Sequence, residues 1–116
     1  MNPKMRLQVM RGASKGKVFN LEPGPNLIGR WDPDCGAFPE IDLEPEDVDA
    51  KVSRKHAVID CRPEVVTIQD VGSLNGTFLN RGPRLEPGQS QKLKNGDELI
   101  IGKTFLKFEI EPFSSE

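Results

Sequence analysis

The stretch Leu106-Lys107-Phe108-Glu109-Ile110 alternates apolar and charged residues without a break. A period of two puts alternate side chains on opposite faces of an extended chain, so this stretch predicts a half-buried β-strand. Arg6-Leu7-Gln8-Val9-Met10 and Val66-Thr67-Ile68-Gln69 alternate in the same way. The inward faces of these three strands supply seven apolar core side chains, namely Leu7, Val9, Val66, Ile68, Leu106, Phe108 and Ile110.

Shorter apolar segments continue this pattern, separated by turn residues that include ten prolines and eleven glycines. These segments are residues 18–21, 27–28, 41–43, 57–61, 78–79 and 99–101. No segment keeps a helical period long enough to predict a helix. The sequence therefore predicts an all-β protein, an antiparallel β-sandwich of about ten or eleven short strands.

Length and charge limit the possible functions. The 116 residues fit one domain, so we expect a single domain over residues 1–116 with its core at about 5–111 and frayed ends at 1–4 and 114–116. The net charge of −2 provides no broad positive field, so we expect no nucleic-acid binding. No apolar run could span a bilayer and the first residues lack a signal peptide's apolar stretch, which predicts a cytoplasmic protein without membrane insertion.

The cysteine and histidine content argues against a metal. His56 is the single histidine, while Cys35 and Cys61 lie far apart and neither belongs to a Cys-x-x-Cys pair. A structural zinc site usually takes four ligands from these residue types, and the chain has too few of them. We expect no metal and no other cofactor, and two unpaired cysteines that are at least half-buried.

Three polar clusters follow one another on loops between the predicted strands. They are Gly29-Arg30, Ser53-Arg54-Lys55-His56 and Asn75-Gly76-Thr77-Phe78-Leu79-Asn80, followed by Asn95-Gly96-Asp97 and Ile101-Gly102. Arginine presents a planar fork of donors that matches a phosphate group, and serine adds a hydroxyl. Loops flanked by glycine expose backbone N–H groups that can surround an anion. These residue types predict recognition of a phosphorylated ligand.

The ordered clusters resemble the forkhead-associated (FHA) domain, a phosphothreonine-reading β-sandwich, and the resemblance runs from about Leu7 to Ile110. It implies that Arg30, in the Gly-Arg motif, is the main phosphate ligand. In the Ser-x-x-His motif it implies that Ser53 hydrogen-bonds the phosphate and that His56 braces the loop.

The resemblance also assigns roles to the neighbouring residues. It implies a further phosphate contact from Arg54, reading of ligand side chains by Lys51 and a grip on the ligand backbone by Asn75. Leu74 stands where many family members have threonine or serine, so it supplies no hydroxyl. In all, ligand contact falls to Arg30, Lys51, Ser53, Arg54, Leu74 and Asn75, and support of the site to Gly29, His56, Gly76, Thr77 and Asn80.

Three functions can be weighed at this stage. Ser53 and His56 could form a nucleophile and its base, but the chain has no Gly-x-Ser-x-Gly elbow, so we expect no enzyme. The resemblance favours an adaptor that binds phosphothreonine in partner proteins of Ser/Thr kinase signalling, with a kinase acting upstream. The alternative is a structural module that docks a protein surface without phosphate, its phosphate site vestigial because of Leu74.

The segment between Arg30 and Ser53 is longer than in compact family members and carries Trp31, three prolines and Gly36. We expect an extended loop here. An acidic cluster within it comprises Asp42, Glu44, Glu46, Asp47 and Asp49, without the spacing of an EF-hand. The cluster is either a solvated acidic loop or a selector that favours basic ligand residues or repels unphosphorylated acidic ones.

Overall fold

The computed structural model describes residues 3–113, so the expected fraying of residues 1–2 and 114–116 lies outside the described residues. The strands are β1 (Met5–Val9), β2 (Val18–Leu21), β3 (Gly24–Gly29), β4 (Ile41–Asp42), β5 (Lys55–Cys61), β6 (Val66–Asp70), β7 (Thr77–Leu79), β8 (Ser90–Lys92), β9 (Glu98–Ile101) and β10 (Thr104–Ile110). Two short 3-10 helices, η1 (Pro33–Cys35) and η2 (Glu44–Glu46), interrupt the β3–β5 connection. The prediction of an all-β chain is confirmed, with ten strands in the described part.

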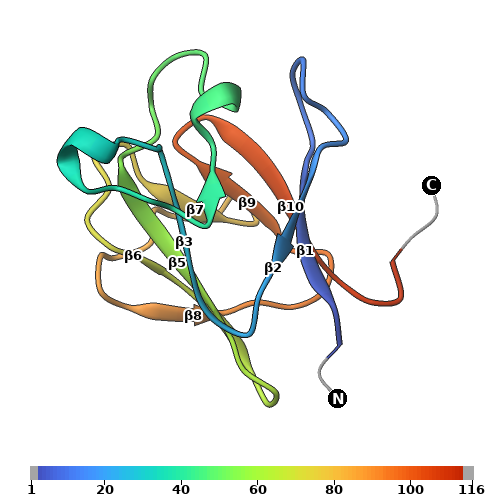
Figure 1. The fold of residues 1–116 in the computed structure, drawn as a ribbon. Coiled ribbons are helices and arrows are strands. Elements are labelled where there is room, and N and C mark those ends of the chain that lie inside the picture. Colours follow the sequence, from blue (N-terminus) through green and yellow to red (C-terminus); the bar gives the residue numbers. More distant parts are fainter. Residues whose placement is uncertain (1–2, 114–116) are drawn as a thin grey trace.

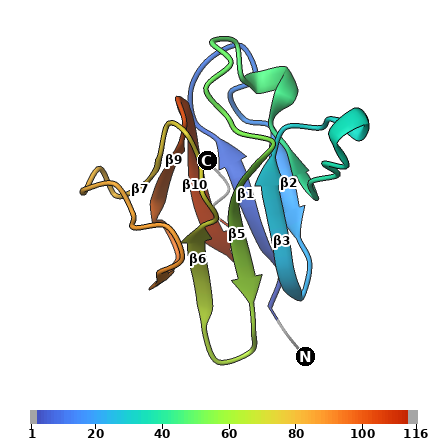
Figure 2. The same cartoon turned by 90° about the vertical axis from the view of Figure 1, so that its left-hand side faces the viewer.

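The strands form two five-stranded sheets that face each other (Figures 1 and 2). One sheet has the order β2-β1-β10-β9-β7 and the other β4-β3-β5-β6-β8. All pairs are antiparallel except β3 with β4, which is parallel. Lys4, where we expect fraying, is tied to the end of β10, because its carbonyl accepts the N–H of Glu111 at 2.8 Å.

The core between the sheets contains the side chains that the alternation selects. Of the seven, six are buried and Ile110 is half-buried against the same cluster. Burial of each large apolar side chain contributes about 1.5–3 kcal/mol to folding. Leu7 of β1 lies opposite Phe108 of β10, so the two most regular stretches of the sequence are paired neighbours.

One strand has no counterpart among the predicted segments. Strand β8 consists of Ser90, Gln91 and Lys92, all exposed, and pairs with β6 at the edge of its sheet. It carries no apolar alternation, so its sequence gives no strand signal. A polar edge strand of this kind also discourages pairing with another chain.

The expectation of an extended, solvated loop before Ser53 is partly wrong. Strand β4 pairs with β3, and Asp42 accepts hydrogen bonds from the backbone N–H groups of Trp31 and Glu44, both at 3.0 Å. Glu46 contacts Ser14 at 3.2 Å and Lys17 at 3.2 Å. These carboxylates hold the loop in shape instead of lying free in solvent.

The cysteines also depart in part from expectation. Both are free thiols, but Cys35 is exposed and only Cys61 is buried. Burial raises the pKa of the Cys61 thiol to about 11.

Within residues 3–113, no helix is both long enough and apolar enough to cross a membrane.

The loops that carry the polar clusters meet at one end of the sandwich (Figure 1). The β3–β4, β4–β5 and β6–β7 connections lie at this end, and the β5–β6 turn lies at the opposite end (Figure 2). Two packed sheets hold such loop ends rigidly while leaving their sequences free to vary.

Candidate functional site

The loops at this end are joined by hydrogen bonds between segments distant in the sequence. The backbone N–H of Arg30 donates to the carbonyl of Arg54 at 3.2 Å, and the Asn75 side chain donates to the carbonyl of Lys51 at 3.1 Å. The N–H of Gly102, in the β9–β10 turn, donates to Gly76 at 3.2 Å. The three clusters of the sequence thus form one continuous surface.

Gly29 permits the closest of these approaches. A Cβ atom at this position would lie 1.9 Å from the carbonyl oxygen of Arg54, so any side chain would displace the backbone. The β3–β5 register also shifts here, because Ile28 pairs with Ala57 and Gly29 pairs with Lys55. His56 is the extra residue of this bulge, and a bulge re-aims the side chains beside it. His56 and Ala57 are consecutive yet both buried.

Arg30 follows directly and is half-buried. Its Nε donates to the carbonyl of Val52 at 3.3 Å, which fixes the side chain along the β4–β5 loop. It forms no salt bridge with any residue in the described part of the chain. A guanidinium held through Nε keeps its two terminal nitrogens available to an anion.

The ring of His56 joins two loops. Its Nδ1 accepts the backbone N–H of Ser53 at 3.0 Å, and its Nε2 lies 2.8 Å from the carbonyl of Gly76. Because a carbonyl only accepts, Nε2 carries the proton and the ring is neutral. Burial lowers the pKa of His56, which favours the same neutral form.

Ser53 keeps a free hydroxyl hydrogen in this arrangement. Its Oγ accepts the backbone N–H of Leu74 at 3.0 Å, which leaves its own proton free to donate to a ligand oxygen. His56 bonds the backbone of Ser53 and not its Oγ. Ser53 and His56 are therefore not arranged as a nucleophile and its base.

Arg54 is exposed and pairs with a residue of the β3–β4 loop. Its Nε lies 2.6 Å from Oδ2 of Asp32. This hydrogen bond lowers the pKa of Asp32 and raises that of Arg54, so both stay charged. Asp32 thereby fixes the direction of a side chain for which the family resemblance implies phosphate contact.

A buried carboxylate organises the β6–β7 loop from below. Asp70 accepts the backbone N–H groups of Gly72 and Ser73, both at 2.8 Å. It also accepts the hydroxyls of Ser73, at 2.5 Å, and Thr77, at 2.7 Å. Burial alone would raise the pKa of Asp70, but the hydrogen bonds from Ser73, Thr77 and Gly72 outweigh it and lower the pKa. The loop rests on an ionised, fully hydrogen-bonded side chain.

Other side chains hold the loop backbone at neighbouring points. The Ser73 hydroxyl accepts the N–H of Gly76 at 3.0 Å, and Arg84 donates to the Ser73 carbonyl at 2.7 Å. Asp47 accepts the N–H groups of Lys51 at 2.7 Å and Val52 at 2.9 Å. These contacts fix the backbone on both sides of the Ser53 hydroxyl.

Asn80 lies farther from the loops. Its backbone has a positive φ of 51°, its Nδ2 donates to Asp97 at 3.0 Å and its Oδ1 accepts the N–H of Glu98 at 2.9 Å. It joins the end of β7 to the start of β9. Leu74, in contrast, is 81% exposed and points no polar group into the site beyond its backbone N–H.

The structure brings most of the predicted site residues together. Arg30, Lys51, Ser53, Arg54, Leu74 and Asn75 lie on adjoining loops, with Gly29, His56, Gly76 and Thr77 beneath or between them and Asn80 at the far end of β7. No site role was predicted for Asp32, Asp70, Ser73 and Arg84, and Asp47 was named only as a member of the acidic cluster. Asp70 carried a usable signal, because an aspartate two residues before a glycine often accepts the N–H groups of the turn.

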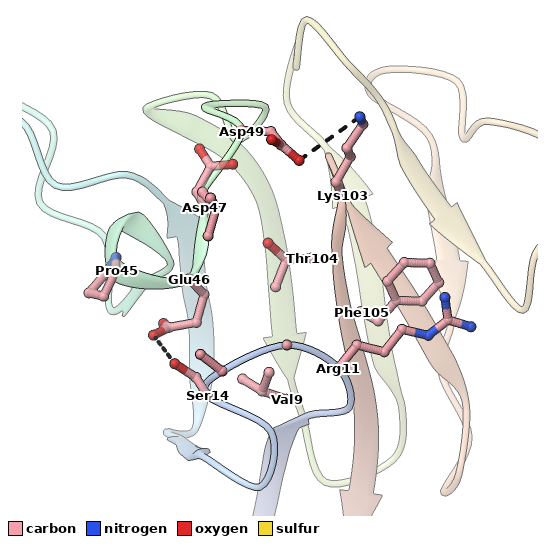
Figure 3. A pocket seen from close by; sticks show the side chains of 13 residues that line it. Val9, Arg11, Ser14, Pro45, Glu46, Asp47, Asp49, Lys103, Thr104 and Phe105 are labelled. Atoms are coloured by element: carbon pink, nitrogen blue, oxygen red, sulfur yellow. Dashed lines mark hydrogen bonds and ion pairs between the residues drawn. The ribbon is translucent and has the colours of Figure 1, made fainter.

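A groove of about 240 Å³ lies beside this surface (Figure 3). It separates the acidic loop from the β1–β2 turn and the start of β10. At its two ends, Ser14 contacts Glu46 at 3.2 Å and Lys103 contacts Asp49 at 4.0 Å. These contacts tie the loop that leads to Lys51 against the neighbouring sheet.

The fold and the loop surface define a class of protein: a β-sandwich whose loop end presents arginine, hydroxyl and amide donors. A family model for the FHA domain matches residues 26–102. The chain belongs to the FHA domain family.

Relatives with regulatory names support this assignment. The chain is 41% identical over 102 residues to an oxoglutarate dehydrogenase inhibitor of Corynebacterium efficiens, which covers 88% of this chain and 63% of that protein. It is 39% identical over 110 residues to the glycogen accumulation regulator GarA of Mycobacterium tuberculosis, which covers 95% of this chain and 60% of GarA. The chain thus spans about three fifths of the length of these relatives.

Solved structures agree with the fold. An FHA domain studied for its phosphothreonine-dependent interactions superposes with a TM-score of 0.72 and 30% identity, covering 95% of this chain and 99% of that one. An FHA domain of an Arabidopsis thaliana protein reaches a TM-score of 0.78 with 32% identity, covering 99% of this chain and 92% of that one.

Proposed function

We propose that this FHA domain is an adaptor that binds phosphothreonine in partner proteins, with Arg30, Ser53, Arg54 and Asn75 as its contact set. A Ser/Thr kinase would act upstream to create the ligand. The regulatory names of the relatives favour such a role, and the expected compartment is the cytoplasm. Because the chain matches only about three fifths of those relatives, their particular targets are not transferred to it.

The observation that carries the proposal is that Arg30 is held against the residue before Ser53 while both side chains keep donors free. Arg30 is fixed through Nε to the residue before Ser53 and forms no salt bridge with any described residue. Ser53 keeps its hydroxyl proton free at the same loop. Hydrogen bonds to a charged group contribute about 1.5–3 kcal/mol each. A phosphate carries up to about two negative charges, and its oxygens can accept hydrogen bonds from both side chains.

The same geometry supports a binding module over an enzyme. Both ring nitrogens of His56 are occupied by backbone groups, and the Ser53 Oγ faces the Leu74 N–H. Two or three charged hydrogen bonds, less the cost of association, correspond to a micromolar ligand at roughly −8 kcal/mol.

The test is a titration of the pure protein with a library of phosphothreonine peptides and their dephosphorylated copies. We expect micromolar binding that requires the phosphate. Equal binding of the dephosphorylated copies would overturn the proposal in favour of phosphate-independent docking. Substituting phosphoserine for phosphothreonine in the best peptide then measures how far the threonine methyl is read.

A further inference from the structure

The segment after Arg30 forms a small hairpin with two exposed aromatic rings. Asp32 and Ala37 exchange both backbone hydrogen bonds, at 3.0 and 2.9 Å, and η1 forms the tip. Beside this pair, Trp31 and Phe38 stack edge to face with ring centroids 5.3 Å apart. The rings remain 49% and 54% exposed. Large aromatic side chains held in a fixed geometry at the surface are typical of contact sites.

This hairpin is continuous with the proposed phosphopeptide site. Trp31 follows Arg30 directly, and its N–H is held by Asp42. Asp32, next in the chain, pairs with Arg54 at 2.6 Å. A peptide bound at Arg30 and Arg54 would therefore pass close to the two rings.

The charge of the hairpin is opposite to that of the site. Residues 31–42 contain four acidic side chains, Asp32, Asp34, Glu40 and Asp42, and no lysine or arginine. Asp34 at the tip is exposed and forms no hydrogen bond within the described residues. The adjoining loops supply the basic side chains Arg30, Lys51, Arg54 and Lys55. A ligand that is anionic at one point and cationic a few residues away complements this surface.

We propose that Trp31 and Phe38 form a subsite for an arginine side chain of the phosphopeptide, within about four residues of the phosphothreonine. The inference rests on the proposed function. Among aromatic residues tryptophan gives the strongest cation–π contact, and a guanidinium stacks flat on such rings. The hairpin carries acidic side chains and no basic one, and Asp34 among them forms no hydrogen bond within the described residues, which favours a cation over an apolar side chain of similar size.

The test starts from the best phosphothreonine peptide of the library and places arginine, leucine, alanine or glutamate at each position within four residues of the phosphothreonine. Affinities are measured for the unmodified chain, for Trp31→Ala, for Trp31→Phe, which keeps a ring, and for Arg62→Ala at the opposite end of the sandwich. We expect arginine to bind about three- to tenfold more tightly than alanine at one position. That ratio should fall close to one in Trp31→Ala and persist in Trp31→Phe and Arg62→Ala.

Three outcomes would overturn the subsite. They are no preference for arginine at any position, a full preference in a folded Trp31→Ala, and a preference for leucine over arginine that Trp31→Ala removes. Each of them leaves phosphate-dependent binding in place. A chain that binds no phosphopeptide would overturn the proposed function as well. Thermal melting of each variant checks that the hairpin substitution leaves the fold intact.

Discussion

The rim that we propose for ligand contact and the buried brace beneath it differ in chemistry. The rim, defined as Arg30, Ser53, Arg54, Leu74 and Asn75, consists of half-buried or exposed side chains on loops. The brace, defined as His56, Asp70, Ser73 and Thr77, is buried, and the polar atoms of its side chains hydrogen-bond one another or loop backbone. If the brace fixes positions and the rim supplies the ligand contacts, as proposed above, substitutions in the two should separate stability from binding.

The largest effect is expected from the brace. Asp70→Ala removes an acceptor of four hydrogen bonds and leaves the buried hydroxyls of Ser73 and Thr77 without an acceptor for their protons. Because each unsatisfied buried group costs about 1–3 kcal/mol, we expect a loss of about 3 kcal/mol or more in the free energy of unfolding, measured with urea. Asp34→Ala, on the exposed hairpin tip, is the matched control and should change it by less than about 0.5 kcal/mol. Equal stability of the two variants would remove the distinction between brace and rim.

The next effect concerns the rim. Arg30→Ala removes a charged donor fork from a loop and no core volume, so binding of a phosphothreonine peptide should weaken by about 2–4 kcal/mol without a change in melting temperature. Arg62→Ala removes the same charge at the far end and should leave affinity unchanged. Calorimetry that finds undiminished affinity in Arg30→Ala would contradict the assignment of the phosphate site.

His56 links stability to pH. Its folded-state pKa lies below the unfolded value of about 6.5, so below pH 6.5 the unfolded chain binds more protons than the folded chain. The free energy of unfolding should therefore fall as the pH drops below 6.5, by at most about 1.4 kcal/mol per pH unit. His56→Ala should be less stable at pH 7.5, bind more weakly and lose this slope between pH 6.5 and 5.5. Lost binding at an unchanged melting temperature would instead make His56 a direct ligand.

A substitution at Leu74 is expected to increase the affinity of the rim for phosphopeptide. Leu74→Thr adds a hydroxyl where many family members have one, and a neutral donor to a charged acceptor contributes about 1 kcal/mol or slightly more. Affinity for the phosphothreonine peptide should rise about five- to tenfold, measured by calorimetry. Weaker binding would show that the exposed leucine makes an apolar contact with the ligand.

The smallest effect comes from the ligand's own ionisation. The second phosphate pKa lies near 6, so the dianion falls to about a quarter of the phosphopeptide at pH 5.5. Affinity should weaken about fourfold between pH 7.5 and 5.5 if the rim reads the dianion. Circular dichroism at both pH values separates this effect from the titration of His56. A flat profile would favour docking that does not depend on phosphate.

Much of the fold was accessible to pattern analysis because burial is periodic. The alternation at 106–110 and 66–69 identified core strands correctly, since one face of each strand is buried. Strand β8 was not accessible, because an exposed edge strand is held by backbone bonds to β6 and needs no apolar residues. The acidic segment between Arg30 and Ser53 was misjudged for a related reason. The sequence cannot distinguish a carboxylate that accepts backbone N–H groups from one that is surrounded by water.

The site divides in the same way. By themselves the residue types and their order predicted the loops and the ability of Arg30 and Ser53 to donate hydrogen bonds to a phosphate. Only the tertiary structure determined that Asp70 holds the β6–β7 loop, that Asp32 orients Arg54 and that Trp31 and Phe38 stack at the surface. The physical reason is that side-chain periodicity is local, whereas hydrogen bonds between loops depend on where the two packed sheets place the ends of their strands.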